Sequence, residues 1–325
     1  MMERKILEQA SAQGIISQDQ VELLLNFDSA ADDNTGSTGN GEEQLRFIRS
    51  FGDIFITLGI IFVAMATAQF DIDGIYKVIP VLVLIATTEW LVRVRRLALP
   101  GIALLISTLY FASQFIGLSK ADFDLANIVI PTTIAFAFYW RYKMPFTLLP
   151  IALGLLSIAT VLLDIDIRQA QYLIVVYGLV IFSVAMWFDS RDVARQTRFS
   201  DAAFWLHLLA APMVVHGVMV SLLIETSSLP FRELLVILFF ASFFMIALYV
   251  DRRAILVSSV SYAIYAIVEL AKNNEIHIEN MALLIFVVFG IFIIVLGVYW
   301  YKIRAVVFSK LNNAALSKYV PAIIR

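Results

Sequence analysis

Three Asp-x-Asp pairs are the residues of this sequence whose type and spacing are best suited to chemistry. Their members are the metal-site candidates Asp71, Asp73, Asp122, Asp124, Asp164 and Asp166. Paired carboxylates can hold a divalent cation, but Ca²⁺ takes about six or more oxygen ligands, so the separate pairs would have to converge. The simpler interpretation is that they lie in short loops and cap the helices that follow.

A second group of candidates consists of polar residues inside long apolar stretches. Such side chains are costly in a bilayer, which makes each of them a functional candidate. His207 and His216 are nine residues apart and would face opposite sides of a helix, so they cannot bind one metal together. The candidates for lining a cavity are His216, Ser107, Tyr110, Gln114, Ser258, Tyr262 and Tyr265. The alternative is that these side chains hold neighbouring helices together.

Other acidic residues have simpler structural explanations. Asp53 suits the N-terminal end of a helix, and Glu89 precedes Arg93 by four residues, which predicts an ion pair on one helix face. The sequence has no cysteine, no nucleotide-binding loop, no His-Glu-x-x-His and no Gly-x-Ser-x-Gly. We therefore expect no catalytic residues and no cofactor, and enzyme activity is the less favoured prediction.

The composition predicts which elements must position these residues. Of the 325 residues, 61% are hydrophobic and 15% are charged, against about 25% charged in a typical soluble domain. The mean hydropathy is +0.85, and apolar runs recur that approach the ~20 residues needed to cross a bilayer. We expect an all-α, polytopic transmembrane bundle of about ten spans. They are 51–70, 76–93, 99–117, 125–140, 145–163, 169–188, 202–224, 230–250, 254–271 and 281–301.

The distribution of cations predicts the orientation of this bundle. Of the 24 Lys and Arg residues, all but Lys77, Lys120, Arg168, Arg232 and Lys272 fall in the segments on one side of the ten spans. Because cytoplasmic loops carry the excess of Lys and Arg, we expect both termini in the cytoplasm. The three Asp-x-Asp pairs then lie in outer loops. The near-neutral charge balance gives no indication of nucleic-acid binding.

The N-terminal region differs from the rest of the chain. Residues 1–27 predict a cytosolic helical pair, in which Gly14 ends the first helix and Ser17 with Gln20 forms a capping box at the second. Residues 28–45 predict a disordered acidic linker, 46–305 the membrane bundle and 306–325 a cytosolic amphipathic tail. The apolar face of the pair is too small for a core of its own, so we expect it to dock on a second copy, on the membrane or on the bundle. The pair also resembles the helical pairs of small oligomerisation modules, and this resemblance implies a homo-oligomer through residues 3–26.

The two ends of the chain resemble a known family. "LEQASAQGIISQDQVELLL" with "GDIFITLGIIFVAMATAQ", and "FGIFIIVLGVYWYKIRAVVFSKL" at the other end, are similar to segments of bacterial multi-pass inner-membrane proteins of unknown function. The middle agrees only in its hydropathy. The chain also departs from the family at "AQFDID", where the family tends to have an Asn-Trp-Asp step. The resemblance implies a bacterial inner-membrane location and no particular activity.

Three functions remain open at this level. The most specific is a small-solute transporter or exporter of unknown substrate, because ten spans divide into two halves of five that would insert with opposite orientation. The first alternative is a non-catalytic membrane scaffold or envelope accessory protein that acts through the N-terminal helices. The second is a membrane enzyme acting on a lipid-linked substrate, which would require the Asp-x-Asp pairs to converge. The lipid bilayer is the one partner expected in every case.

Overall fold

The computed structural model describes residues 7, 11–23, 48, 50–70, 72–116, 125–165, 167–225, 232–253, 255, 256, 260, 264, 278–308 and 320. The chain divides into two compact units, Met1–Gln44 and Leu45–Arg325. Every regular element among the described residues is helical. The prediction of an all-helical protein is therefore confirmed for the part that the structure describes.

In the first unit, residues 18–23 are helical and the predicted capping box is present. The backbone N–H of Ser17 donates to Oε1 of Gln20 at 2.9 Å, and the N–H of Gln20 donates to Oγ of Ser17 at 3.2 Å. Gly14 precedes this helix with a φ of +72°, a conformation that favours glycine. Local sequence signals alone therefore predicted this turn correctly.

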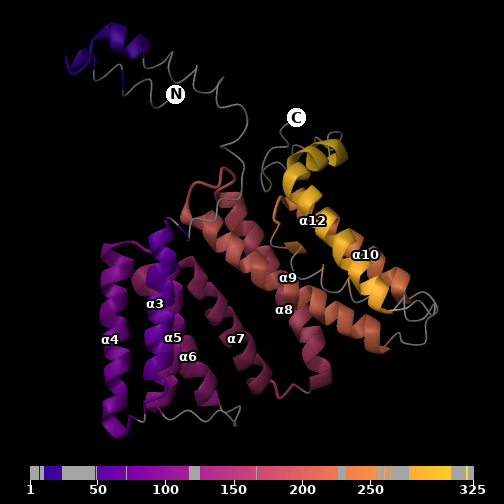
Figure 1. Cartoon of the computed structure of the whole chain (residues 1–325), viewed down its shortest axis with the longest axis horizontal. Helices are drawn as coiled ribbons and strands as arrows, with labels where there is room; N and C mark the ends of the chain where they lie inside the picture. The colour runs from indigo at the N-terminus through magenta and orange to yellow at the C-terminus, as the bar shows by residue number, and fades with distance from the viewer. Residues whose placement is uncertain are drawn as a thin grey trace. The chain divides into compact units, whose positions relative to one another are not determined.

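The second unit begins with helices arranged around α5 (Figure 1). α3 (Phe51–Thr67) and α4 (Val78–Thr88) both pack on α5 (Ala98–Ile116). The 3₁₀ turn η1 (Gly74–Lys77) leads into α4, and the π-helical turn η2 (Glu89–Val94) follows it. Asp53 lies in the first turn of α3, as predicted, and accepts a hydrogen bond from Oγ of Ser50 at 3.0 Å.

α6 (Leu125–Tyr142) and α7 (Leu148–Leu162) form the next packed pair, joined by the 3₁₀ turn η3 (Pro145–Thr147). Their closest approach uses a glycine, because a Cβ at Gly154 would lie 1.9 Å from Oγ1 of Thr132. α7 in turn contacts α9.

α8 (Ile167–Arg191) and α9 (Arg198–Glu225) make the most extensive helix contact in the described part of the chain. Small residues allow it: Ala185, Ala203 and Ala210 are fully inaccessible. Gly178 faces α9 so closely that a Cβ there would lie 2.9 Å from Cβ of Met213. Such residues let membrane helices approach and gain dispersion contacts, since lipid tails are as apolar as the side chains they would replace.

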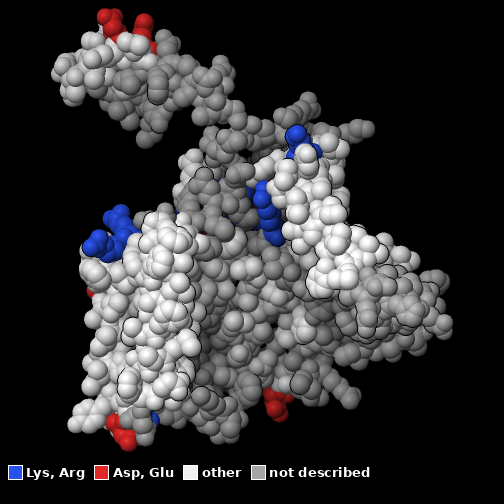
Figure 2. All heavy atoms as spheres, viewed as in Figure 1, with Lys and Arg blue, Asp and Glu red and all other residues white. Residues whose placement is uncertain are grey.

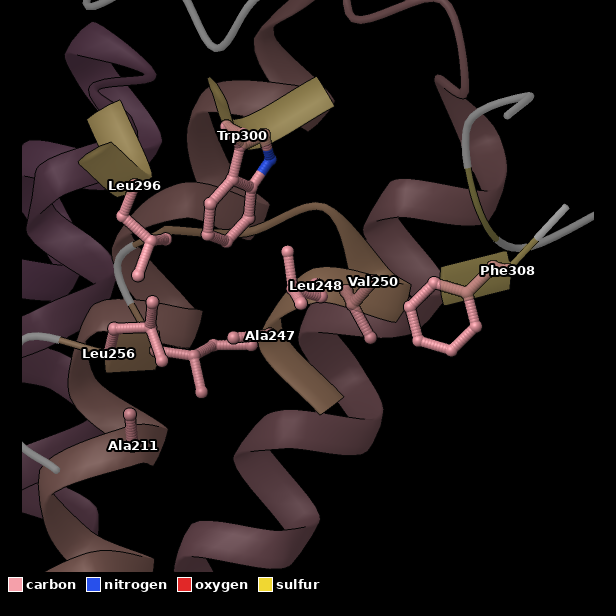
Figure 3. Packing of buried hydrophobic residues seen from close by; sticks show 9 residues of the cluster. Ala211, Ala247, Leu248, Val250, Leu256, Leu296, Trp300 and Phe308 are labelled. Atoms are coloured by element: carbon pink, nitrogen blue, oxygen red, sulfur yellow. The ribbon is translucent and has the colours of Figure 1, made fainter. Parts of the chain in front are cut away.

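α10 (Arg232–Val250) and α12 (Ile278–Phe308) complete the described helices. Figure 3 shows the core they share, which we call the α10–α12 core. Its members are Ala211, Ala247, Leu248, Val250, Ile255, Leu256, Leu296, Trp300 and Phe308. α12 is kinked at Tyr299, next to Trp300 in this core.

The helices have the length and composition of a membrane protein. Among the residues that the structure describes, six helices are long and apolar enough to cross a bilayer, and two further apolar helices are shorter. The six are Gly74–Val94, Ala98–Ile116, Pro145–Leu162, Gln171–Arg191, Arg198–Met219 and Leu283–Phe308. Helices occupy nine of the ten expected spans, and the remaining span, 254–271, lies mostly outside the described residues. In Figure 2, Lys and Arg gather where η2 ends, while Asp and Glu appear at the opposite end of the same helices.

Candidate functional site

The most unusual feature of the second unit is a set of charged and polar side chains that are almost inaccessible to solvent. We call it the buried charge network, and its members are Asp189, Arg195, Ser200, His207, Asp251, Arg252, Trp300 and Arg304. None of these residues is more than 8% exposed. They come from the end of α8, the loop after it, α9, the residues just after α10, and α12. Four helices are therefore joined at one end by polar contacts.

Asp189 is the centre of the first half of the network. Its Oδ2 lies 2.9 Å from Nε2 of His207 and accepts a hydrogen bond from Nε of Arg252 at 3.2 Å. Nη2 of Arg252 donates to the other carboxylate oxygen, Oδ1, which makes the Asp189–Arg252 pair bidentate. The same Nη2 lies 3.2 Å from Oγ of Ser200. One carboxylate thus links α8 to α9 and to the end of α10.

Asp251 is the centre of the second half. Its Oδ2 pairs with Nη1 of Arg195 at 3.1 Å, and its Oδ1 accepts a hydrogen bond from Nε1 of Trp300 at 2.6 Å. Nη2 of Arg195 also donates to the backbone oxygen of Asp251 at 2.6 Å. Both residues have positive φ, 55° for Arg195 and 59° for Asp251. Non-glycine residues adopt this conformation only where the surroundings compensate its cost. Here the contacts between Arg195 and Asp251 provide that compensation.

Arg304 caps the C-terminal end of α10. Its Nε donates to the backbone oxygen of Leu248 at 3.1 Å, and its Nη2 donates to that of Tyr249 at 3.3 Å. The last carbonyls of a helix have no partner within the helix and carry partial negative charge. A guanidinium donates hydrogen bonds to them and also balances that charge. α12 is therefore fixed to the end of α10 by charge as well as by the α10–α12 core.

Asp192 shapes the loop that brings α8 and α9 together. Its carboxylate accepts hydrogen bonds from the backbone N–H of Gln196 at 2.9 Å, and from the N–H and hydroxyl of Thr197 at 2.7 and 2.8 Å. Burial raises the pKa of Asp192, but these hydrogen bonds lower it further than burial raises it, so the net pKa lies below its usual range. Asp192 is therefore ionised at neutral pH and sets the start of α9.

Each charge of the network needs a partner, because it is buried. Isolating one charge in a buried position costs several kcal/mol, whereas a complete set of ion pairs and hydrogen bonds offsets most of the desolvation. His207 also packs edge-to-face against Phe182, with ring centroids 5.1 Å apart, so the imidazole that contacts Asp189 lies against an aromatic ring as well. What the arrangement does chemically is join the ends of four helices by ion pairs and hydrogen bonds.

A second, more exposed ion cluster lies where η2 meets α6. Oε1 of Glu89 lies 2.5 Å from Nη1 of Arg93, which confirms the predicted pair, and 2.6 Å from Nη2 of Arg141. All three side chains are a third or more exposed. Exposed pairs contribute little to stability, so this cluster is a less promising candidate than the buried one.

The structure brings together two of the predicted cavity-lining residues. Tyr110 and Gln114 line a cavity of about 210 Å³ with Lys77 and Phe111. Ser107 is buried within α5 and is not among the residues lining that cavity. His216 is exposed on α9, on the face opposite the fully buried His207, as the nine-residue spacing predicted. Ser258, Tyr262 and Tyr265 lie outside the described residues.

Two of the six predicted metal-site carboxylates are described, and both Asp73 and Asp164 are exposed. Asp71, Asp122, Asp124 and Asp166 lie outside the described residues. Among the residues the structure describes, no three His, Cys, Asp or Glu side chains gather in a way that could hold a metal ion.

Sequence reasoning missed the buried charge network, although its signal is visible. "DSRDVAR" follows the sixth expected span and "DRR" follows the eighth, and the Lys and Arg excess to which both loops contribute predicts only the orientation of the bundle. The aspartates in these loops are the informative residues, because a cytoplasmic loop needs Lys and Arg but has no topological need for acids. An acid immediately at a helix end, beside Arg, indicates an ion pair rather than an orientation signal.

Comparison with known proteins adds no further constraint. No protein-family model matches the chain, and no match was found among curated proteins or among solved structures. The candidate site therefore stands on its own geometry: four helices of an apolar bundle joined at one end by a buried network of ion pairs and hydrogen bonds.

Proposed function

We propose that this chain is a multi-pass membrane transporter of a small solute, in which the buried charge network closes one end of the pathway. The observation that carries the proposal is the burial of two aspartates, three arginines and a histidine at the ends of four apolar helices. Ionisable residues within membrane helices are rare and costly, and they mark the routes of ions and substrates.

The composition of the network favours a gate over a permanent clamp. Apolar side chains of similar volume would hold the same helices together at least as well, because they avoid the desolvation cost of the charges. Ion pairs between helix ends have a property that apolar packing lacks. They can be exchanged for water when the helices separate, so that the open state is not penalised by exposed apolar surface.

The proposal includes about ten spans with both termini in the cytoplasm, which places the network at the cytoplasmic end. The support for this orientation is the distribution of Lys and Arg along the sequence, together with the cations that gather where η2 ends (Figure 2). The bacterial inner membrane is the location we propose, on the resemblance of the two chain ends.

The scaffold alternative predicts that the network never opens in the folded protein.

Thiol labelling of the folded protein tests the gate. Ala211 is 3% exposed and belongs to the α10–α12 core, one helical turn beyond His207 on α9. We expect an Ala211→Cys variant in lipid nanodiscs to react slowly with a polar maleimide. Addition of Asp189→Asn should accelerate the reaction at least tenfold, because the neutral amide no longer balances Arg252. Since the chain has no native cysteine, the introduced thiol is the only reactive one.

A second buried thiol separates opening from unfolding. Leu105, on α5, is fully inaccessible and lies far from the network in sequence. A Leu105→Cys variant should remain protected when Asp189→Asn is present. Equal acceleration at both thiols would mean that the substitution unfolds the bundle, and no acceleration at Ala211→Cys would mean that the network does not gate anything. Either result contradicts the proposal.

A further inference from the structure

A polar cavity and an apolar groove share walls on the α3–α4–α5 side of the second unit. The cavity of about 210 Å³ is lined by nine residues, among them Lys77, Tyr110 and Gln114. The groove of about 680 Å³ is lined by fifteen residues and includes Thr67, Ile72, Pro80 and Phe111 from the same set. The two hollows therefore adjoin, the smaller one lined by more polar surface and the larger one mostly apolar.

The groove arises from how the three helices pack. α3 and α4 each pack on α5, and the groove lies between them with Leu104 and Phe111 of α5 at its base. Gly59 widens it, because a Cβ at this position would meet no atom within 4 Å. Its volume falls within the range of about 300–1,000 Å³ that is typical of small-molecule sites.

The walls of the groove are apolar even where threonine occurs. The hydroxyl of Thr67 donates to the backbone oxygen of Val63, and that of Thr87 donates to Val83, both at 2.7 Å. Each hydroxyl is thus turned onto its own helix. Val63, Ile79 and Val83 are more than half exposed, so the groove opens sideways toward the surface that faces the hydrocarbon in a membrane-spanning helix bundle. An acyl chain fits such a surface.

The length of the groove matches one leaflet of a bilayer. Along α3 it extends from Ile56 to Thr67, twelve residues whose ends lie about 17 Å apart at the rise of an α-helix. Half of the hydrocarbon core is about 15 Å thick. The polar cavity lies at the end of the groove where α3 ends and η1 begins, which is the depth expected for a lipid headgroup.

The side chains that line the polar cavity favour a negatively charged headgroup. Lys77 supplies a cation, and the hydroxyl of Tyr110 and the amide of Gln114 supply hydrogen-bond donors. Asp73 is exposed nearby in sequence but is not among the residues that line the cavity. We infer that this cavity and groove bind one anionic glycerophospholipid, with the phosphate at Lys77 and an acyl chain along α3. The site is separate from the buried charge network, so either assignment can fail without the other.

Competition between lipids tests this site in the intact protein. The full chain would be reconstituted in nanodiscs of equal parts phosphatidylglycerol and phosphatidylcholine, extracted gently, and examined by native mass spectrometry for retained lipid. We expect preferential retention of phosphatidylglycerol. A Lys77→Gln variant should reduce that preference about fivefold, the effect of one cation near an anionic headgroup.

Two matched pairs of variants separate the site from general effects. Gly59→Leu places a side chain in the groove and should reduce retention of both lipids, whereas Gly290→Leu, at another glycine with open space around it, should not. Arg95→Gln removes an exposed cation just beyond η2 and should leave the preference unchanged. Equal retention of the two lipids by the unmodified protein would overturn the inference. So would an Arg95→Gln effect as large as that of Lys77→Gln.

Discussion

Replacing Arg252 with alanine is expected to lower the free energy of unfolding by about 3–5 kcal/mol, the cost of breaking a buried ion pair by removing one partner. Arg252 is 1% exposed and neutralises Asp189, which would be left buried with only His207 and no bidentate partner. The measurement is denaturant or thermal unfolding of the purified protein in detergent, followed by loss of tryptophan fluorescence.

The neighbouring arginine provides the matched control. Arg253 lies over the rings of Trp300 and Tyr301, at 5.4 and 5.6 Å, and is only partly buried. Arg253→Ala should therefore cost about 1 kcal/mol or less. A double variant with Asp189→Leu and Arg252→Met removes both charges and should recover most of the lost stability. Equal effects of the two single alanine variants would show that Asp189 and Arg252 are not a buried pair.

A Gly178→Val variant is expected to destabilise the protein by about 1–3 kcal/mol, the usual cost of overpacking a close helix contact. A Cβ at Gly178 would lie 2.9 Å from Cβ of Met213 and 3.2 Å from the backbone nitrogen of Val214. The backbone of α9 cannot move aside without disturbing the α8–α9 packing that positions Asp189 against His207. Thermal unfolding in detergent measures the effect.

Gly290→Val is the control for this substitution, because a Cβ at Gly290 would meet no atom within 4 Å. Both glycines lie within helices, so the intrinsic cost of the backbone change is the same for the two variants. The difference between them reports the α8–α9 contact alone. If Gly290→Val were as destabilising as Gly178→Val, the close approach of α8 and α9 would not be the cause.

The helices were predictable from the sequence because they depend on local patterns. Apolar runs, Pro145 at the start of a turn and the Ser17–Gln20 capping box all act within a few residues of one another. The Glu89–Arg93 pair was predictable for the same reason, since it is one helical turn long. In each case the energy that determines the structure is contained in a short segment.

The buried charge network was not predictable in this way. Asp189 is separated from His207 by 18 positions and from Arg252 by 63, and no local pattern relates them. Their types, an acid or base at a span end, are also what orientation and capping require. Asp189, His207 and Arg252 come together only because α8 packs against α9 and α9 packs against α10.

The most direct test of the account is the distance between helix ends around the network in a lipid bilayer. Spin labels can be attached through introduced cysteines at two exposed positions, Ala194 after α8 and Lys302 on α12. Pulsed electron–electron double resonance then measures the distance between the two labels. A gate predicts two distances, with Asp189→Asn increasing the population of the longer one. A single distance that Asp189→Asn leaves unchanged would contradict the account and identify the network as a permanent clamp.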